Sequence, residues 1–213
     1  MPVLLIVAAI SYLLGSIPFG YLLVRLFRGE DVRLTGSGNI GATNVARKSP
    51  ALGLLTLLLD ALKGTCAVLL ANALFMRIAP GNVDASLYPP LSLVALCAVL
   101  GHMFPVWLRF RGGKGVATSA GAFALLVPRA TLGAFAIFMV VALALRYVSL
   151  ASIIAAASLP ILAWFSLRHR YGEGLLTLLP IAIASALVIV KHHENIRRLL
   201  AGTESRFGRG VRK

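Results

Sequence analysis

Long apolar runs constrain the fold of this chain more than any other feature of its sequence. Charged residues make up 13% of the 213 residues, whereas soluble domains carry about 25%, so lipid must surround much of the surface. The first run starts directly after Met1 without a basic segment, which predicts a membrane span rather than a cleaved signal peptide. We expect an all-α, polytopic integral membrane bundle with seven transmembrane helices, at 3–27, 51–76, 87–108, 116–127, 130–145, 148–167 and 175–190.

The boundary at Pro128-Arg129 is ambiguous, because one long kinked helix and two short helices fit the sequence equally well. Three polar stretches, 36–47, 109–118 and 191–207, can form a common site only if they share one face of the membrane. An even number of crossings must then separate the second stretch from the third. Pro128-Arg129 is therefore predicted to divide two short helices.

The basic residues predict the orientation. An N-terminus outside the cell leaves only Arg77, Arg129, Arg168 and Arg170 on the outer side, so the polar stretches and the C-terminus are expected in the cytoplasm. Cytoplasmic loops and anionic headgroups or substrates explain the net charge of +14 better than nucleic acid does, because no separate binding domain exists. We expect one domain over 1–213, with a basic flexible tail at about 205–213.

The first polar stretch, Gly36-Ser37-Gly38-Asn39-Ile40-Gly41-Ala42-Thr43-Asn44-Val45-Ala46-Arg47, is a candidate phosphate or carboxylate site. Its glycines allow positive φ and close approach of a ligand, and its polar side chains supply hydrogen bonds. An ordinary Gly/Asn-rich connection fits this stretch alone equally well. The candidate binding residues are Ser37, Gly38, Asn39, Gly41, Thr43, Asn44 and Arg47.

The second stretch combines Gly101-His102-Met103-Phe104-Pro105 with Phe110-Arg111-Gly112-Gly113-Lys114-Gly115-Val116-Ala117-Thr118. Gly-Gly-Lys-Gly at a helix start offers backbone N–H groups, a positive dipole end and a lysine, so Gly112, Gly113, Lys114 and Gly115 are candidates for anion binding. The Walker spacing is absent, which disfavours nucleotide hydrolysis. Two interpretations of His102 fit the sequence equally well: a residue that packs between helices and a residue of the binding site.

The third stretch runs from Lys191 to Glu204. In a helix, His192 and Asn195 share one face at i and i+3 and could close over a substrate. A basic amphipathic helix on the membrane surface explains Arg197 and Arg198 equally well.

Charged and hydroxyl residues inside the spans add weaker candidates. Asp60 and Lys63 are spaced to neutralise each other within a span, either as a structural pair or in support of a neighbouring site. Ser149 and Ser152 begin a span on the face of the polar stretches and are candidate phosphate contacts. Cys66 and Cys97 are interpreted as packing residues.

Several catalytic patterns are absent from the sequence. It contains no zinc-ligand spacing, no G-x-S-x-G elbow and no H-x-x-x-x-D motif. We therefore expect no metal and no cofactor. A site built to hold anions, without a nucleophile–base pair, could catalyse transfer only from an activated substrate.

Taken together, G-S-G-N-I-G-A-T-N-x-x-R, G-H-x-F-P, F-R-G-G-K-G-V-A-T and H-x-x-N-I-x-R-L-x-x-G-x-E resemble the bacterial acyl-phosphate:glycerol-3-phosphate acyltransferase family of the inner membrane. Asp60-x-x-Lys63-Gly64 is similar to that family's pattern too. The resemblance implies transfer of a fatty acyl group from acyl-phosphate to the sn-1 hydroxyl of glycerol 3-phosphate. The products would be lysophosphatidic acid and phosphate, and neither acyl-CoA nor acyl carrier protein would be needed.

The resemblance also implies residue roles. Ser37, Arg47, Lys114, His192 and Asn195 would be the catalytic residues that bind and orient glycerol 3-phosphate. Thr43 and nearby backbone N–H groups would hold the phosphate of the acyl-phosphate, and the acyl chain would lie between helices. The supporting residues would be Asp60, Lys63, His102 and Glu204. The proton acceptor is left open between the substrate's phosphate, which we favour, and His192.

These expectations place a monomeric enzyme in contact with membrane lipids and not with nucleic acid, with its site on the cytoplasmic face of the bacterial inner membrane. The alternative is a transporter of a phosphorylated metabolite, with Asp60 and Lys63 lining its pathway. A transporter site is expected near the midplane, whereas the special residues of this sequence crowd one face.

Overall fold

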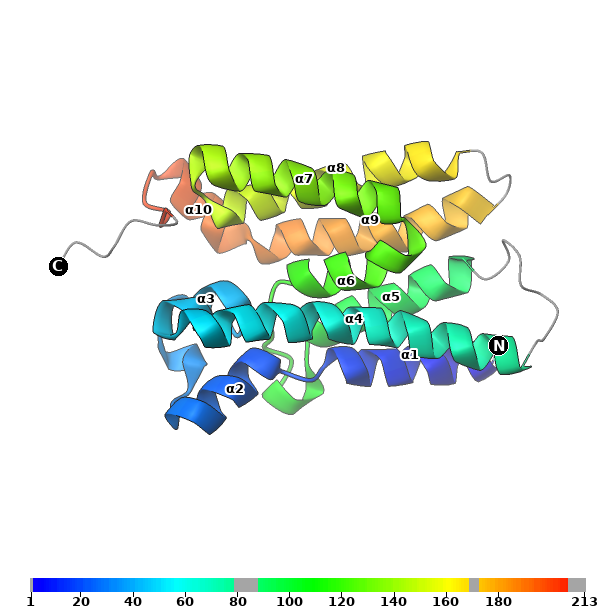
Figure 1. Ribbon diagram of the computed structural model, residues 1–213, viewed down its shortest axis with the longest axis horizontal. Coiled ribbons are helices and arrows are strands. Elements are labelled where there is room, and N and C mark those ends of the chain that lie inside the picture. Colours follow the sequence, from blue (N-terminus) through cyan, green and yellow to red (C-terminus); the bar gives the residue numbers. More distant parts are fainter. Residues whose placement is uncertain (1, 79–87, 169–172, 207–213) are drawn as a thin grey trace.

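The computed structural model describes residues 2–78, 88–168 and 173–206, and over these residues the regular structure is helical throughout. Most helices run along the long axis of the molecule (Figure 1). The α-helices are α1 (Pro2–Gly15), α2 (Phe19–Arg28), α3 (Ala42–Lys48), α4 (Pro50–Ile78), α5 (Tyr88–Met103), α6 (Val116–Leu126), α7 (Pro128–Leu145), α8 (Val148–Leu167), α9 (Glu173–Lys191) and α10 (His193–Leu200), with 3-10 turns η1 (Val32–Leu34) and η3 (Val106–Leu108).

Six segments of the described chain are long and apolar enough to cross a membrane: Pro2–Arg28, Pro50–Ile78, Tyr88–Leu108, Pro128–Leu145, Val148–Leu167 and Gly174–Lys191. The seventh predicted span corresponds to α6, which has only 11 residues. At 1.5 Å per residue such a helix covers roughly 16 Å, about half of a hydrocarbon core. The expectation of an all-helical integral membrane bundle is therefore met, whereas α6 is too short to count as a span by its length.

The first predicted span, 3–27, corresponds to the candidate span Pro2–Arg28, but it is not one continuous helix. The structure divides it into α1 and α2 at Ser16-Ile17-Pro18. Pro18 has no N–H to continue the hydrogen-bond ladder, and it disfavours helical geometry at Ile17. The α2 helix consequently leaves the direction of α1 (Figure 1).

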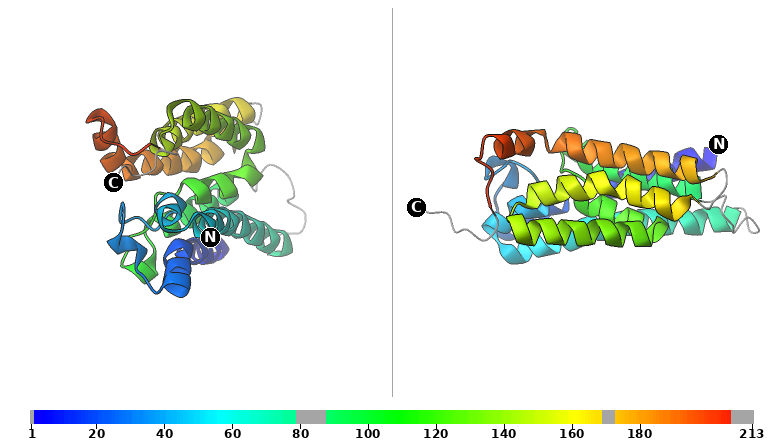
Figure 2. Two further views of the ribbon diagram at one scale, coloured as in Figure 1. Left: turned by 60° about the vertical axis from the view of Figure 1, so that its left-hand side comes forward. Right: turned by 90° about the horizontal axis from the view of Figure 1, so that it is seen from above.

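The long helices form two groups. One group contains α1, α4, α5 and α6, the other contains α7, α8 and α9, and contacts between α5 and α9 join them (Figures 1 and 2). As predicted, Pro128 separates two helices, because α6 ends at Leu126 and α7 starts at Pro128. The first and third polar stretches consequently lie at the end of the bundle that carries α3 and α10, which is called the site end below, and the second lies on the same side, beside the break between α1 and α2 (Figure 1).

Glycines allow the helices of the first group to approach very closely. A Cβ on Gly15 would lie 2.0 Å from the carbonyl oxygen of Ala98, and one on Gly101 would lie 2.1 Å from that of Tyr12. Gly64 and Gly121 hold α4 against α6 in the same reciprocal way. Small residues are the usual means of close helix packing within lipid, where no hydrophobic force drives helices together.

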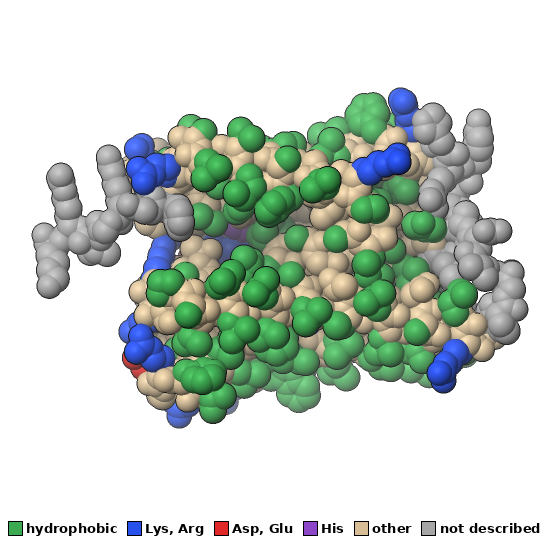
Figure 3. Space-filling model, viewed as in Figure 1, with side chains coloured by type: hydrophobic (Ala, Val, Ile, Leu, Met, Phe, Trp, Pro, Cys, Tyr) green, Lys and Arg blue, Asp and Glu red, His purple; other side chains and the backbone are tan. Residues whose placement is uncertain are grey.

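Apolar side chains cover the flank of the bundle and basic side chains lie towards both ends (Figure 3). Leu132, Val140 and Leu143 on α7 are each more than 60% exposed. Such a belt is stable only in contact with lipid.

Candidate active site

The first polar loop is held in shape by Asn44, which is 3% exposed. The Asn44 side-chain amide donates to the carbonyl oxygens of Val32, Thr35 and Asn39 at 2.9–3.1 Å, and its oxygen accepts from the N–H of Ser37 at 2.9 Å. The hydrogen bonds of Asn44, a predicted binding residue, thus stabilise the loop itself. A Cβ on Gly36, where φ is 59°, would collide with the Asn44 oxygen at 2.2 Å, so this position requires glycine.

The second polar loop folds back onto the end of α5. The N–H groups of Gly112 and Gly113 donate to the carbonyl oxygens of Met103 and His102, at 3.2 and 3.0 Å. Gly115 then caps the start of α6 with φ 83°. These bonds place Lys114, which lies between Gly113 and Gly115, at the N-terminal end of α6. The dipole of this helix favours anions at that end.

The third stretch bends at His192, which separates α9 from α10. The Nδ1 atom of His192 lies 2.7 Å from the carbonyl oxygen of Val188, which identifies Nδ1 as the protonated nitrogen of the neutral ring and leaves Nε2 as an acceptor. Asn195 is 7% exposed and accepts a hydrogen bond from the ammonium of Lys114. This bond joins the second stretch to the third, 81 positions apart in sequence.

Glu204 connects this pair to α8. Its carboxylate accepts hydrogen bonds from Ser149, Asn195 and Arg198, each at 2.6 Å. The predicted support residue Glu204 and the predicted phosphate contact Ser149 therefore bind each other. Ser152 donates to the carbonyl oxygen of Val148 within its own helix.

A cleft of about 200 Å³ opens between these loops. It is visible in Figure 3 as a hollow at the site end, with basic and histidine side chains inside it. The predicted residues Ser37, Gly38, Asn39, Gly112 and Lys114 line it. The other lining residues are Lys191, His193, Glu194 and Arg198, none of which is among the site residues predicted from the sequence.

The remaining predicted residues lie around the cleft. Arg47 donates to the hydroxyl of Ser205 at 2.8 Å, which ties α3 to the segment after α10, and Arg206 donates to the hydroxyl of Tyr147 at 2.9 Å. The start of the predicted flexible tail, residues 205–206, is thus bound to the site end, while 207–213 lies outside the described residues. Gly41 caps α3, and Thr43 is exposed on that helix.

Burial shapes the electrostatics of the cleft. It lowers the pKa of Lys114 to about 8, although Glu204 partly opposes the shift. Burial also lowers the pKa of His192 to about 4, so this ring is neutral at pH 7. Burial alone would raise the pKa of Glu204, but the hydrogen bonds from Ser149, Asn195 and Arg198 outweigh it and keep the pKa below its ordinary value.

A buried polar cluster lies beneath the second loop. Lys63 and Asp60 form an ion pair at 2.8 Å, and the Nδ1 atom of His102 lies 3.5 Å from the same Asp60 oxygen. Lys63 also donates to the carbonyl oxygen of Ile17 at 2.8 Å, at the break between α1 and α2. A Cβ on Gly113 would lie 1.9 Å from His102 Nε2. The cluster thus connects the helix break to the loop that carries Lys114.

The family model described as glycerol-3-phosphate acyltransferase matches residues 5–202 of this sequence. The chain belongs to this family. Two relatives that bear the family's name are each 48% identical to it. The relative from Syntrophotalea carbinolica aligns over 198 residues, which cover 92% of this chain and 94% of that one, and the relative from Agrobacterium fabrum aligns over 209 residues, which cover 97% and 94%.

Solved structures of the family share the fold. A crystal structure of PlsY (YgiH), an integral membrane glycerol 3-phosphate acyltransferase, in its glycerol 3-phosphate form has a TM-score of 0.83 at 39% identity and covers 96% of both chains. Its lysophosphatidic acid form has a TM-score of 0.79 at 37% identity and covers 96% of this chain and 95% of that one. The family resemblance inferred from the motifs is confirmed.

Proposed function

We propose that this chain transfers a fatty acyl group from acyl-phosphate to the sn-1 hydroxyl of glycerol 3-phosphate, giving lysophosphatidic acid and inorganic phosphate. The observation that carries the proposal is the cleft at the site end, where two glycine loops meet Lys114, Lys191 and Arg198. The names of the relatives and the glycerol 3-phosphate form of PlsY support the choice of acceptor.

The lining of the cleft suits two phosphate groups. Bringing a second phosphate beside the first costs Coulomb energy, which nearby cations offset. Lys114, Lys191 and Arg198 supply such cations, and the adjacent loops supply backbone N–H groups. In our proposal Ser37, Arg47, Lys114, His192 and Asn195 hold glycerol 3-phosphate, while Thr43 and the first loop hold the phosphate of the acyl-phosphate.

The reaction then needs orientation more than activation, because an acyl-phosphate is a mixed anhydride with a good leaving group. The sn-1 hydroxyl oxygen forms a bond to the acyl carbonyl carbon, and the bond from that carbon to the phosphate oxygen breaks. The released phosphate takes the hydroxyl proton. Neither a covalent acyl-enzyme nor a metal is required for this balance.

The state of His192 supports the substrate's phosphate as the base. A ring with a pKa of about 4 is a weak base at pH 7. His192 can still accept a hydrogen bond at Nε2 and so orient the acceptor hydroxyl, because Nδ1 is engaged with Val188.

In the membrane, we propose seven crossings, with the N-terminus outside and the site in the cytoplasm of a bacterial cell. The α6 helix packs against α4, α5 and α7, so protein can replace lipid around a short crossing. The concentration of basic residues in the polar stretches supports a cytoplasmic site end. In our proposal the enzyme acts as a monomer, and one chain supplies every residue of the site.

The test is phosphate release from palmitoyl-phosphate by the purified protein in lipid, without CoA or added metal. We expect release that depends on glycerol 3-phosphate and matches the lysophosphatidic acid formed. Folded protein that releases no phosphate would refute the proposal. Uptake of glycerol 3-phosphate into vesicles would then be measured, because it would identify a transporter.

A further inference from the structure

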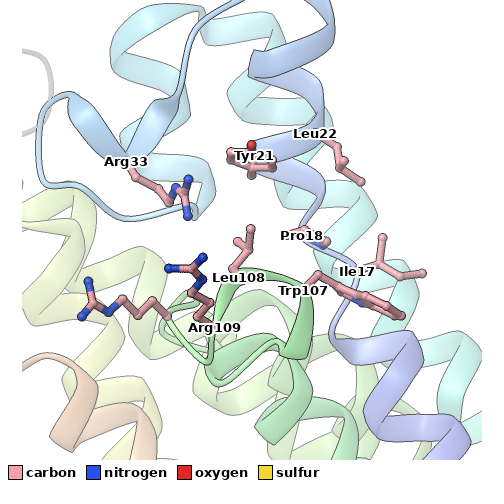
Figure 4. A pocket seen from close by; sticks show the side chains of 9 residues that line it. Ile17, Pro18, Tyr21, Leu22, Arg33, Trp107, Leu108 and Arg109 are labelled. Atoms are coloured by element: carbon pink, nitrogen blue, oxygen red, sulfur yellow. The ribbon is translucent and has the colours of Figure 1, made fainter.

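A second and larger pocket, of about 790 Å³, lies between the break that divides α1 from α2 and the η3 turn. Arg33, Tyr21 and Leu22 approach it from one side and Trp107 and Arg109 from the other (Figure 4). Its full lining is Ile17, Pro18, Tyr21, Leu22, Arg33, Trp107, Leu108, Arg109 and Arg111. The pocket shares no lining residue with the cleft, although Arg111 of the pocket directly precedes Gly112 of the cleft.

The pocket has an excess of positive charge. Arg109 and Arg111 are exposed, and their side chains have no hydrogen-bond or ion-pair partner within residues 2–78, 88–168 and 173–206. Arg33 packs over the ring of Tyr21 and pairs with Asp31 at 2.6 Å. Three guanidinium groups therefore line the pocket and only that of Arg33 is paired with a carboxylate, so the pocket is complementary to an anion.

The other part of the pocket is apolar and open to the surroundings. Trp107 is 62% exposed and Leu22 is 45% exposed, and the half-buried Ile17 and the buried Pro18 also line the pocket. Tryptophan beside arginine is typical of the level at which headgroups meet acyl chains. The volume is in the range of pockets that hold a whole small molecule rather than a bare phosphate.

We propose that this pocket binds an anionic phospholipid of the surrounding bilayer. Its phosphate accepts hydrogen bonds from Arg109 and Arg111 at the rim, and the upper part of its acyl chains lies against Ile17, Leu22 and Trp107. The site is separate from the proposed acyl-transfer cleft, and the lipid remains chemically unchanged.

The two tryptophans of the chain make a direct test possible. In a Trp164→Phe variant, Trp107 is the remaining tryptophan, and lipids with bromine high in their acyl chains quench its fluorescence on contact. The protein is reconstituted in phosphatidylcholine vesicles that contain a minor fraction of brominated phosphatidylglycerol or, in parallel, of brominated phosphatidylcholine. Neither acyl-phosphate nor glycerol 3-phosphate is present.

We expect the brominated anionic lipid to quench Trp107 at a several-fold lower fraction than the brominated phosphatidylcholine. Changing both pocket arginines, as Arg109→Gln with Arg111→Gln, should remove this preference, since each basic side chain near the surface enriches anionic lipid about fivefold. The matched control is Arg77→Gln with Arg129→Gln, which removes two charges at the other end of the bundle. This control should keep the preference.

Three results of the quenching measurements with the two lipids would overturn the proposal. They are equal quenching by the two lipids, a preference that survives in the Arg109/Arg111 variant, and a preference lost equally in the Arg77/Arg129 variant. Thermal unfolding of each variant in detergent verifies that it is folded before it is reconstituted. Inorganic phosphate added outside the vesicles should not relieve the quenching, because the bound group is lipid; relief by phosphate would show that the pocket takes free phosphate instead.

Discussion

The environment of Lys114 leads to a specific prediction about the pH dependence of the reaction. Its ammonium is partly buried, contacts Asn195, and has a pKa lowered to about 8. A lowered lysine pKa means that the positive charge is present below about pH 8 and is lost as the pH rises through that value.

We therefore expect kcat/KM for glycerol 3-phosphate to fall above about pH 8, by up to about tenfold per pH unit. A Lys114→Arg variant should lack this alkaline limb, because a guanidinium stays charged throughout the range. The measurement is a pH profile of both proteins. An unchanged alkaline limb in Lys114→Arg would assign it to another group.

Arg47 is a proposed ligand of glycerol 3-phosphate that is not among the residues lining the cleft, and its guanidinium donates to Ser205. Hydrogen bonds to charged groups contribute about 1.5–3 kcal/mol, so Arg47→Ala should raise KM for glycerol 3-phosphate by about 10- to 100-fold. The matched control is Lys48→Ala, the next residue, whose ammonium pairs with Glu30 on the surface. The test is the KM for glycerol 3-phosphate of both variants, measured by steady-state kinetics. An Arg47→Ala variant with the kinetics of the parent protein would exclude Arg47 from the site.

Among the structural elements, the loop after α5 depends on the absence of a side chain at Gly113. A Cβ there would meet His102 Nε2 at 1.9 Å, and His102 is 5% exposed and cannot move aside. Gly113→Ala should therefore displace Lys114 and lower kcat/KM by about 100-fold or more while the protein still inserts into the membrane. Gly133→Ala is the control, because its Cβ would meet only a leucine side chain at 3.1 Å. Comparable activity of the two variants would contradict the arrangement.

Lys63 connects α4 to the break between α1 and α2, because it binds both Asp60 and the carbonyl oxygen of Ile17. Lys63→Met should cost about 3–5 kcal/mol of stability, because it leaves a buried carboxylate unpaired. Asp60→Asn combined with Lys63→Met should recover part of that loss. Thermal unfolding in one detergent measures the double variant and both single variants, Lys63→Met and Asp60→Asn. Simple addition of the two single effects would show that the residues do not act as a pair.

At the scale of the whole molecule, residues attached to both helix groups meet at the site end. Arg47 lies on α3, which packs against α4 of the first group, and Lys114 lies just before α6, whereas their partners Ser205 and Asn195 follow α9 of the second group. A shift of one group against the other would separate these partners. The cleft can therefore exist only when both groups are packed together.

The orientation of this assembly in the membrane can be tested with two cysteine variants of a protein that lacks Cys66 and Cys97. A membrane-impermeant maleimide applied to intact cells should label Arg77→Cys, and should label Ser205→Cys only after lysis. Labelling of Ser205→Cys in intact cells would reverse the proposed topology.

The sequence predicted the helices well where local chemistry decides them. Apolar runs predicted the long helices, Pro128 separates α6 from α7, and parity placed three polar stretches at one end. One expectation was incomplete, because Pro18 divides the first span into two helices, and the seventh crossing stays a prediction, because α6 matches the predicted 116–127 but has only 11 residues. Hydropathy averages over a window, so it conceals a single broken turn inside an apolar run.

The sequence by itself thus determined that the chain folds as helices in lipid. It also determined that glycine loops and cations meet at one end. Both follow from hydropathy, proline and glycine, which act over a few neighbouring residues. Only the tertiary structure decided which side chains face the cleft. It assigned Asn44 to the inside of its loop, made Glu204 the acceptor for three donors, and brought Lys191 and Arg198 to the lining. These assignments depend on contacts between segments far apart in the chain, and no local pattern encodes which partner a polar side chain will find.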